Sequence, residues 1–375
     1  IARIDYASKS TANLRHLQRR AVGAISALAD KLLAANNLPK KNLATVLVGG
    51  NTTMQHMLLG VDPSGIAVAP FTPAFTNPRE ESAANVGLKI AADGKLRVMP
   101  AISGYVGGDI VGDMLAVGWA CPDCDRKDTE LLIDIGTNGE IVMRAGDEII
   151  ACSTAAGPAF EGAKITCGTR AIPGAINSVD VVGDDIAVET IDGKKPLGIC
   201  GTGLLDIVAV LLELGVIDAG GRMAVSAENL PSGVAKRLIP HADGGSAVVL
   251  ADDVILTARD VREFQLAKAA IAAGVKVLLD LKGRTPANVD AVLLAGAMGS
   301  FLRPQNAIRT GLLPYGFKPA QIKAVGNTAL EGAGLCLLSG EYRRSAEIIS
   351  KSCQYVELSG RLDFQTAYME TMLFE

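Results

Sequence analysis

Aromatic residues are scarce in this 375-residue chain, at 4%, whereas 49% of its residues are hydrophobic and 41 are glycines. A core with so few rings has to be built from Ala, Val, Leu and Ile against closely approaching backbone. The chain is too long for one small core, so we expect a large α/β unit or two packed lobes. This composition is typical of α/β enzymes.

Long uncharged apolar runs are also missing. The most apolar stretch, 204–217, contains Asp206 and Glu213, which argues against a membrane-spanning helix. Basic residues form no run longer than two, and the formal net charge is -4, so we expect neither a membrane nor a nucleic acid as partner. Seven scattered cysteines and no signal peptide predict reduced thiols in a cytoplasmic protein.

Metal-ligand patterns are sparse as well. Cys121 and Cys124 form one CxxC motif, which supplies two of the four ligands that a structural zinc needs. The other five cysteines lie mostly in apolar or small-residue contexts and are expected to be core thiols. His16, His56 and His241 show no triad or metal pattern. We therefore expect this chain to hold neither zinc nor iron.

The order of predicted elements is that of a two-lobed α/β protein. Alternating strands and helices predict parallel strands covered by helices in a first lobe, 1–128, and a polar segment then marks the boundary to a second lobe, 129–375. Strands are predicted at 44–48, 95–99, 131–135, 140–143, 148–152 and 291–294. Helices are predicted at 202–214, 260–281 and 329–350.

The segment 131–140 is an apolar strand that contains a carboxylate and ends in a small polar turn. Asn138-Gly139 is a strong signal for an ordinary hairpin, and that alternative stays open. It leaves Asp134 unexplained, because an ionised carboxylate between two isoleucines is costly unless paired, hydrogen-bonded or near a metal. At the carboxyl end of a strand, Asp134 would hold Mg²⁺, usually through water. Phosphate oxygens would then be bound by Gly136, Thr137, Asn138 and Gly139.

Polar residues after two other predicted strands have a functional and a structural interpretation. Asn51, Thr52 and Thr53 either orient a water or a phosphate, or simply cap the next helix. Asp109 follows two glycines and is either a polarising acid in the cleft or an N-cap residue. Both interpretations stay open for each group.

Glycine-containing segments further along the chain are ambiguous in the same way. The segment from Gly157 to Glu161 predicts a loop that enters a helix, whose amides either bind an anion or belong to a capped structural helix. Gly201 and Gly203 permit close approach of the backbone, either to a nucleotide or to a packed helix. Lys268 either reaches an adenosine or lies on a solvated helix face.

The motif Asp-Ile-Gly-Thr-Asn at 134–138 resembles a phosphate loop of the acetate and sugar kinase, Hsp70 and actin superfamily. It implies their two-lobed, ribonuclease H-like α/β fold. Gly296, Ala297 and Gly299 resemble the adenosine-binding turn, with ordinary strand-to-helix packing as the alternative. The chain is similar in order to the reductive activators of corrinoid proteins at 50–60, 151–162, 198–206, 260–268 and 293–299.

This resemblance implies an ATPase that uses ATP and Mg²⁺ to drive reduction of a corrinoid protein from Co(II) to Co(I), with Asp134 and Asp109 as catalytic residues. The family carries a [2Fe-2S] cluster on an N-terminal ferredoxin-like domain and a first phosphate loop, both expected upstream of Ile1, so the first lobe is expected to be incomplete. The implied partner is a corrinoid protein, and a homodimer is left open. A small-molecule kinase of the same fold and a non-catalytic ATP-binding module are the alternatives.

Overall fold

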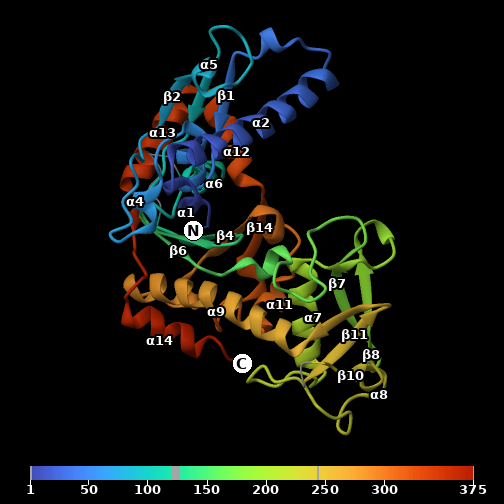
Figure 1. Ribbon diagram of the computed structural model, residues 1–375. Coiled ribbons are helices and arrows are strands. Elements are labelled where there is room, and N and C mark those ends of the chain that lie inside the picture. Colours follow the sequence, from blue (N-terminus) through green and yellow to red (C-terminus); the bar gives the residue numbers. More distant parts are fainter. Residues whose placement is uncertain (1, 120–126, 243–244, 375) are drawn as a thin grey trace. The chain divides into compact units, whose positions relative to one another are not determined.

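The computed structural model describes residues 2–119, 127–242 and 245–374, and the chain divides into two compact units (Figure 1). The first unit comprises Ile1–Arg126, Glu148–Ala151 and Asn327–Val356. The second comprises Lys127–Asp147, Cys152–Gly326 and Glu357–Glu375. The fold class predicted from the sequence, a two-part α/β architecture, is confirmed.

A small mixed sheet organises the first unit. Its strands are β1 (Thr45–Val48), β3 (Lys95–Val98) and β2 (Arg79–Ser82), in the order β1-β3-β2. β1 and β3 are parallel, as the alternation of strands and helices predicts, and β2 is antiparallel to β3. Apolar side chains such as Leu96 and Val98 pack with Val22 of the long helix α2 (Thr11–Ala35), whose N-cap is Ser10.

Shorter helices complete the N-terminal part of this unit. They are α1 (Ala2–Ser8), α3 (Thr52–Leu59), α4 (Ser64–Ala67), α5 (Ala83–Val86) and α6 (Gly108–Ala116), with a 3₁₀ turn at Lys40–Asn42. A second apolar cluster joins Ile4, Leu14, Met57 and Ile66, so it links four of the helices. α3 follows β1 and α6 comes after β3, which places the starts of both helices near the carboxyl ends of parallel strands.

The C-terminal segment 327–356 belongs to the first unit, although the predicted boundary at residue 128 assigned it to the second lobe. It forms α12 (Thr328–Leu338), α13 (Gly340–Ser352) and β15 (Gln354–Tyr355), so the helix predicted at 329–350 is two helices. α12 packs tightly on α6, where a Cβ on Gly332 would lie 2.0 Å from the carbonyl oxygen of Gly112. A contact between helices this far apart in sequence leaves no local pattern, and the division near residue 128 stays a prediction.

The larger sheet runs through the second unit in the order β14-β13-β4-β5-β6-β15. Its strands there are β4 (Thr129–Ile135), β5 (Gly139–Ala145), β13 (Ala291–Ala295) and β14 (Ile322–Gly326), together with the end of β6 (Glu148–Thr154) from Cys152 on. β13 is parallel to both β4 and β14, whereas β5 is antiparallel to β4. The buried helix α9 (Ala258–Leu281) packs on β5. Helix α14 (Leu362–Glu370) lies beside α9, as Figure 1 shows.

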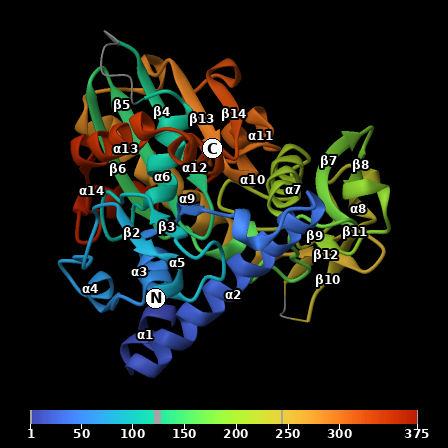
Figure 2. The same cartoon turned by 90° about the horizontal axis from the view of Figure 1, so that it is seen from above.

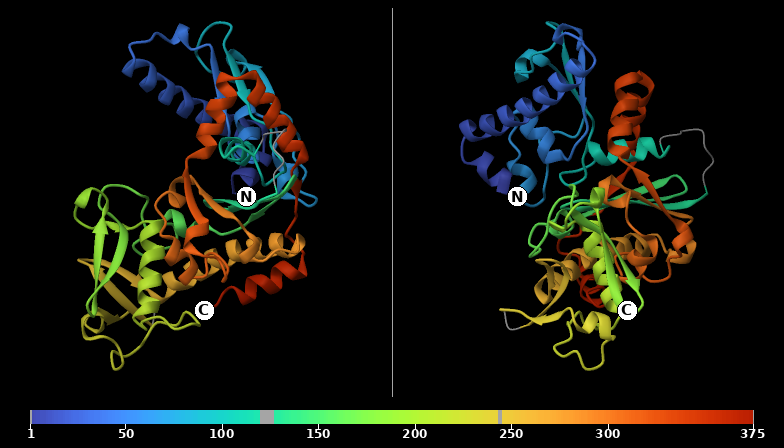
Figure 3. Two further views of the ribbon diagram at one scale, coloured as in Figure 1. Left: turned by 180° about the vertical axis from the view of Figure 1, so that it is seen from behind. Right: turned by 90° about the vertical axis from the view of Figure 1, so that its right-hand side faces the viewer.

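A second group of strands lies beside helix α7 (Gly201–Glu213), which packs on β7 (Figure 2). These strands are β7 (Ala175–Val182), β8 (Asp185–Thr190) and β9 (Gly198–Ile199), in the order β8-β7-β9. A further antiparallel sheet consists of β10 (Leu238–Pro240), β11 (Ser246–Ala251) and β12 (Val254–Thr257). The short helices are α8 (Ser232–Ala235), α10 (Gly296–Gly299) and α11 (Pro304–Arg309), and Figure 3 gives two further views.

The elements predicted at 202–214 and 260–281 are confirmed as α7 and α9, because both are strongly apolar and continuous. Thr257 and Asp260 form a capping box that fixes the first turn of α9. Within the described residues, no helix is both long and apolar enough to cross a membrane.

The contact between α6 and α12 gives a stability prediction. Gly332→Ala should lower the free energy of unfolding by about 2 kcal/mol, because the new methyl group would overlap backbone that cannot move aside. Gly334→Ala on the same helix is the matched control, since a Cβ there meets nothing within 4 Å. Denaturant unfolding of both variants measures the effect, and equal stabilities would contradict the close packing.

Candidate functional site

The predicted phosphate turn joins two antiparallel strands. Asp134 pairs with Glu140 and Ile135 with Gly139, so the hairpin interpretation is confirmed for the local backbone. The amide of Gly136 donates to the carbonyl of Asn138 at 2.9 Å and closes the turn. That amide is therefore already engaged and is not available to a phosphate, contrary to the simple prediction.

The hairpin does not explain Asp134, which lies at the carboxyl end of β4 opposite Ala295 of the parallel strand β13. Its carboxylate lies against Gly296, where a Cβ would be 2.6 Å from Oδ1 and φ is +78°. Within the described residues, no hydrogen bond or ion pair reaches this carboxylate. Burial raises the pKa of Asp134 above its ordinary value. A half-buried carboxylate that has no protein partner in the described part of the chain fits a bound cation.

The loop after β6 approaches the turn from the other side. The amide of Gly157 donates to the carbonyl of Thr137 at 2.9 Å, and the Thr137 hydroxyl donates to the Glu161 carboxylate. The helix predicted after Gly157 is only a 3₁₀ turn, Pro158–Glu161, so the predicted anion-binding helix start is not formed there. Phe160 holds this loop on α9 by an edge-to-face contact with Phe264, with ring centroids 5.7 Å apart.

A cavity of about 750 Å³ opens next to the turn, within the second unit. This volume lies within the range of ligand sites, which is roughly 300–1,000 Å³. Its walls are Ile135, Gly136, Phe160, Glu161, Arg170, Ala171, Asn177, Thr190, Ile191, Asp192, Cys200, Gly201, Thr202, Ala297, Met298 and Phe301. The cavity therefore joins the phosphate turn, the predicted adenosine turn and the start of α7.

Four predicted residues line this cavity directly: Gly136, Glu161, Gly201 and Ala297. Three other predicted glycines lie in close packing contacts. A Cβ on Gly203 would lie 2.1 Å from the carbonyl oxygen of Ile176, and one on Gly299 would lie 2.8 Å from the carbonyl carbon of Leu294. Gly139 has the same role, because a Cβ there would lie 2.8 Å from Ile271. The packing alternative thus accounts for these three positions.

Lys268 does not lie on a solvated face, and it is not among the residues that line the described cavity. Its side chain is buried, and Nζ donates to the carbonyl of Leu373 at 2.5 Å. The ammonium group also lies 5.0 Å from the ring centroid of Phe374. Lys268 therefore ties α9 to the C-terminal segment, a role that neither interpretation of the sequence anticipated.

Several cavity residues carry no signal in the sequence. Arg170 contributes a positive charge, and Phe301 an aromatic ring that is 75% exposed, which suits stacking on a planar base. The Oδ1 atom of Asn177 is buried and, within the described residues, accepts no hydrogen bond. A ligand donor would satisfy it, so the cavity fits a ligand with a polar planar base.

A buried polar network holds β7, and with it Asn177, in place. The Asp206 carboxylate accepts from Asn306 Nδ2 at 2.6 Å and lies 3.3 Å from Arg303 Nε. Arg303 also pairs with Asp180 at 2.6 Å and donates to the Ser178 hydroxyl. Burial raises the pKa of Asp206, although Asn306 and Arg303 oppose that shift. These contacts connect α7, α11 and β7 and give the cavity a fixed wall.

The predicted residues of the first unit lie together at the carboxyl ends of β1 and β3. Asn51 caps α3 by accepting from the amide of Met54 at 2.9 Å, and the Thr52 hydroxyl donates to the carbonyl of Ser103 at 2.6 Å. Asp109 lies in the first turn of α6 and accepts from the amide of Ile110 at 3.0 Å. The capping interpretation is confirmed for Asn51, while the roles of Thr53 and Asp109 stay predictions.

The cysteine and histidine expectations have mixed outcomes. Cys121 and Cys124 lie outside the described residues, and the other five cysteines are free thiols. Four of these are buried, as predicted, but Cys167 is half-buried. Burial raises the pKa of Cys336 to about 11. His56 is buried, stacks on Phe75 and accepts from the amide of Ala74 at 3.1 Å, which confirms a structural role.

Comparison with known protein families decides the relationship. The family model of the C-terminal domain of RACo, described as the ASKHA domain, matches residues 128–375, and the model of the RACo middle region matches residues 1–120. The chain belongs to the family of RACo C-terminal ASKHA domains. The resemblance inferred from the phosphate turn is thereby confirmed.

Individual relatives agree with this family assignment. The chain is 30% identical over 383 aligned positions to the corrinoid activation enzyme RamQ of Eubacterium limosum, covering 100% of this chain and 63% of that protein. It is 28% identical to a [Co(II) methylated amine-specific corrinoid protein] reductase of Methanosarcina barkeri, covering 65% of this chain and 44% of that one.

A solved structure described as a reductive activator for a corrinoid, iron-sulfur protein superposes with a TM-score of 0.88 at 32% identity, over 99% of this chain and 59% of that one. The RACo-family chain thus spans about 60% of the length of these first relatives.

The buried carboxylate gives a stability prediction. Asp134→Asn should raise the melting temperature of the ligand-free chain by about 2 °C at neutral pH, because it removes a buried negative charge. The raised pKa sets the sign: the folded state favours protonated Asp134, and that stability is lost as pH rises through the folded pKa. The gain of the variant should therefore be larger at pH 8 than at pH 5.

The control for this comparison is Asp147→Asn, which neutralises an exposed carboxylate at the turn between β5 and β6. Differential scanning calorimetry at the two pH values measures both variants. A loss of stability in Asp134→Asn, or a gain that does not grow with pH, would show that Asp134 is compensated in the folded chain.

Proposed function

We propose that this chain is the ATP-binding and ATP-hydrolysing module of a reductive activator that returns a corrinoid protein from Co(II) to Co(I). The observation that carries the proposal is the uncompensated carboxylate of Asp134 beside the polar turn at the cavity. The printed names of the relatives, a corrinoid activation enzyme and a Co(II) corrinoid protein reductase, support the choice of reaction.

The charges around the cavity favour a metal-bound polyphosphate. Glu161 and Asp192 line the cavity with Arg170, and Asp134 adds a third carboxylate next to it. Three carboxylates against one guanidinium would repel a bare triphosphate, so a divalent cation is needed to balance the charge. In this proposal Mg²⁺ is held by Asp134, usually through water, and supplies charge neutralisation at the phosphate oxygens when bound.

Chain groups would then orient the nucleotide. The amides of Thr137 and Asn138 have no hydrogen-bond partner within the described residues and would donate to phosphate oxygens. The Thr137 hydroxyl, now donating to Glu161, would keep that carboxylate beside the cavity. Asn177 and Phe301 would contact the base, and the turn Gly296-Ala297 would approach the adenosine. Asp109 and Asn51–Thr53 are proposed as further nucleotide-site residues on the family resemblance.

In this proposal the nucleotide-site residues do not carry the electron. On the family resemblance, we place the electron-carrying [2Fe-2S] cluster on a domain that precedes this chain. One electron from that cluster would reduce Co(II) to Co(I), and ATP hydrolysis would make the transfer favourable by changing the complex with the corrinoid protein. The partner is accordingly a corrinoid protein.

Nucleotide chemistry is tested first, with the full-length activator, ATP and Mg²⁺. Asp134→Asn should lower the rate of Mg²⁺-dependent phosphate release at least about 100-fold, because the charge that holds the metal is lost. Asp147→Asn is the matched control and should keep the wild-type rate. A wild-type chain that binds ATP without releasing phosphate would favour the binding module, and acceptor-dependent phosphorylation would favour the kinase.

Corrinoid chemistry is tested with the full-length activator, a Co(II) corrinoid protein and titanium(III) citrate as electron source, followed by anaerobic absorbance spectroscopy. ATP-dependent formation of Co(I) should occur with the wild type and be lost in Asp134→Asn. Phosphate release without any ATP-dependent Co(I) formation would leave the ATPase standing and overturn the assigned reaction.

A further inference from the structure

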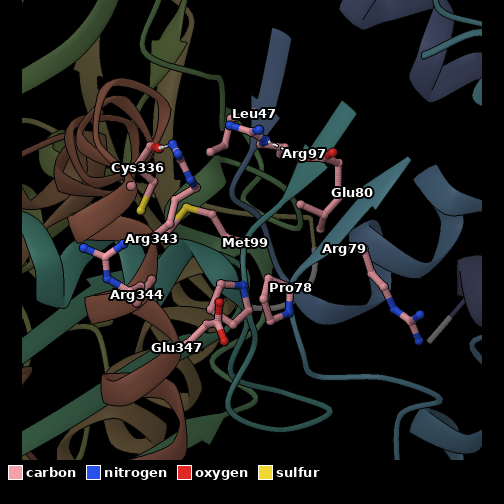
Figure 4. A pocket seen from close by; sticks show the side chains of 14 residues that line it. Leu47, Pro78, Arg79, Glu80, Arg97, Met99, Cys336, Arg343, Arg344 and Glu347 are labelled. Atoms are coloured by element: carbon pink, nitrogen blue, oxygen red, sulfur yellow. Dashed lines mark hydrogen bonds and ion pairs between the residues drawn. The ribbon is translucent and has the colours of Figure 1, made fainter. Parts of the chain in front are cut away.

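A second cavity, of about 360 Å³, lies entirely within the first unit and shares no lining residue with the cavity of the second unit. Its walls come from two sources that are distant in sequence. Residues of β1, β2, β3 and the segment after β3 form one wall, and α13 with the end of α12 forms the other. Figure 4 shows Met99 between these two walls. The volume is at the small end of the range for ligand sites.

Arginine dominates the lining of this cavity. Four arginines and two glutamates line it, which gives an excess of two positive charges in a chain whose formal net charge is -4. Arg79 is directed away from the other three in Figure 4, and its guanidinium lies 5.0 Å from the ring centroid of Phe75. Arg97 donates from Nε to Glu80 at 2.7 Å and lowers the pKa of that carboxyl. These two arginines therefore have partners within the protein.

The remaining two arginines, Arg343 and Arg344, each place one guanidinium nitrogen near Gly340. A Cβ on Gly340 would lie 3.3 Å from Arg343 Nη2 and 3.8 Å from Arg344 Nη1. Adjacent residues on a helix normally direct their side chains apart, and two like charges repel. Glycine at position 340 leaves room for both guanidinium groups above the first turn of α13. The arrangement concentrates positive charge at one end of the cavity.

The two guanidinium groups are not neutralised by the protein. Arg343 donates to the carbonyl of Cys336 at 2.7 Å, which fixes its position at the end of α12 but leaves its charge uncompensated. Within the described residues, Arg344 has no hydrogen bond or ion pair, and neither arginine pairs with Glu347, one turn further along α13. An incoming anion would therefore find donors that are already placed.

The wall formed by the strands carries apolar residues beside Glu80 and Arg97. These apolar residues are Leu47, Pro78, Val98, Met99 and Pro100. Val98 and Met99 are buried core residues, so this surface is rigid. A site with an apolar wall facing two guanidinium groups suits a molecule that has an anionic head and an apolar body.

We propose that this cavity binds a small organic anion, with its phosphate or carboxylate group between Arg343 and Arg344 and its apolar part against Leu47 and Met99. Guanidinium groups form paired hydrogen bonds with both kinds of head group, which explains the choice of arginine over lysine. The site is separate from the nucleotide cavity, and nothing in its assignment depends on ATP hydrolysis.

The test uses the chain with three probes that share one ring: phenyl phosphate, benzoate and the neutral benzyl alcohol. Isothermal titration calorimetry should show saturable binding of one or both anions, weaker binding at higher ionic strength, and none of the alcohol. Comparison of the two anions identifies the preferred head group. Absence of saturable binding by both anions, or equal binding of the alcohol, would overturn the proposal.

Arg344→Gln should weaken anion binding about ten-fold or more, because it removes charge-assisted hydrogen bonds from an exposed residue whose loss leaves the fold intact. Arg344→Lys should give an intermediate affinity, since the charge remains and the planar fork is lost. Lys351→Gln is the matched control: it removes one positive charge from the exposed last turn of α13, outside the cavity, and should leave the affinity unchanged.

A second control separates the two cavities. Arg170→Gln removes the arginine of the nucleotide cavity and should not affect binding of the ring probes. Binding that is lost in Arg170→Gln and kept in Arg344→Gln would assign the anions to the nucleotide cavity and overturn the proposal. An equal loss of anion affinity in Lys351→Gln and Arg344→Gln would show that the anions are attracted by charge alone and not bound at this cavity. That result would also overturn the proposal.

Discussion

A half-buried carboxylate at the carboxyl end of β4, beside which the described residues place no cation, is the constraint on which the second unit depends. Burial raises the free energy of the charged form of Asp134. The carboxylate lies where β13 runs parallel to β4, and it fits there because Gly296 has no side chain. Residues adjacent in sequence to Asp134 and Gly296 line the large cavity. The position of one uncompensated charge therefore defines where a metal-bound ligand would lie.

Close backbone contact at glycine replaces the large side chains that the chain lacks. Gly201 lies against the carbonyl of Phe160, Gly203 against Ile176, and Gly332 against Gly112. Each contact holds two segments at a distance that any side chain would increase. The positions of these segments are therefore fixed although the residues that pack between them are small. Substitutions of these glycines should therefore destabilise the protein, because the added side chains have no space to move into.

The two cavities differ in their charge. Carboxylates outnumber arginine around the cavity of the second unit, which calls for a cation together with an anionic ligand. In the first unit, Arg343 and Arg344 both reach Gly340, and neither has a carboxylate partner in the part of the chain that the structure describes, so an anion alone suffices. This contrast follows from the placement of a few side chains, since the charges of the whole chain nearly balance.

Local sequence alone determined the elements whose signals are continuous: the hairpin around Asn138-Gly139, the apolar helices α7 and α9, the parallel strands β1 and β3, and the anomaly at Asp134. Tertiary structure decided the rest. Arg170, Asn177 and Phe301 line the same cavity only because segments that are distant in sequence fold around it. Lys268 is buried because its ammonium group binds the C-terminal segment. Segment 327–356 joined the first unit through the contact of Gly332 with α6. Periodicity and turn chemistry act between near neighbours, whereas cavities and unit boundaries arise from contacts that a local pattern does not encode.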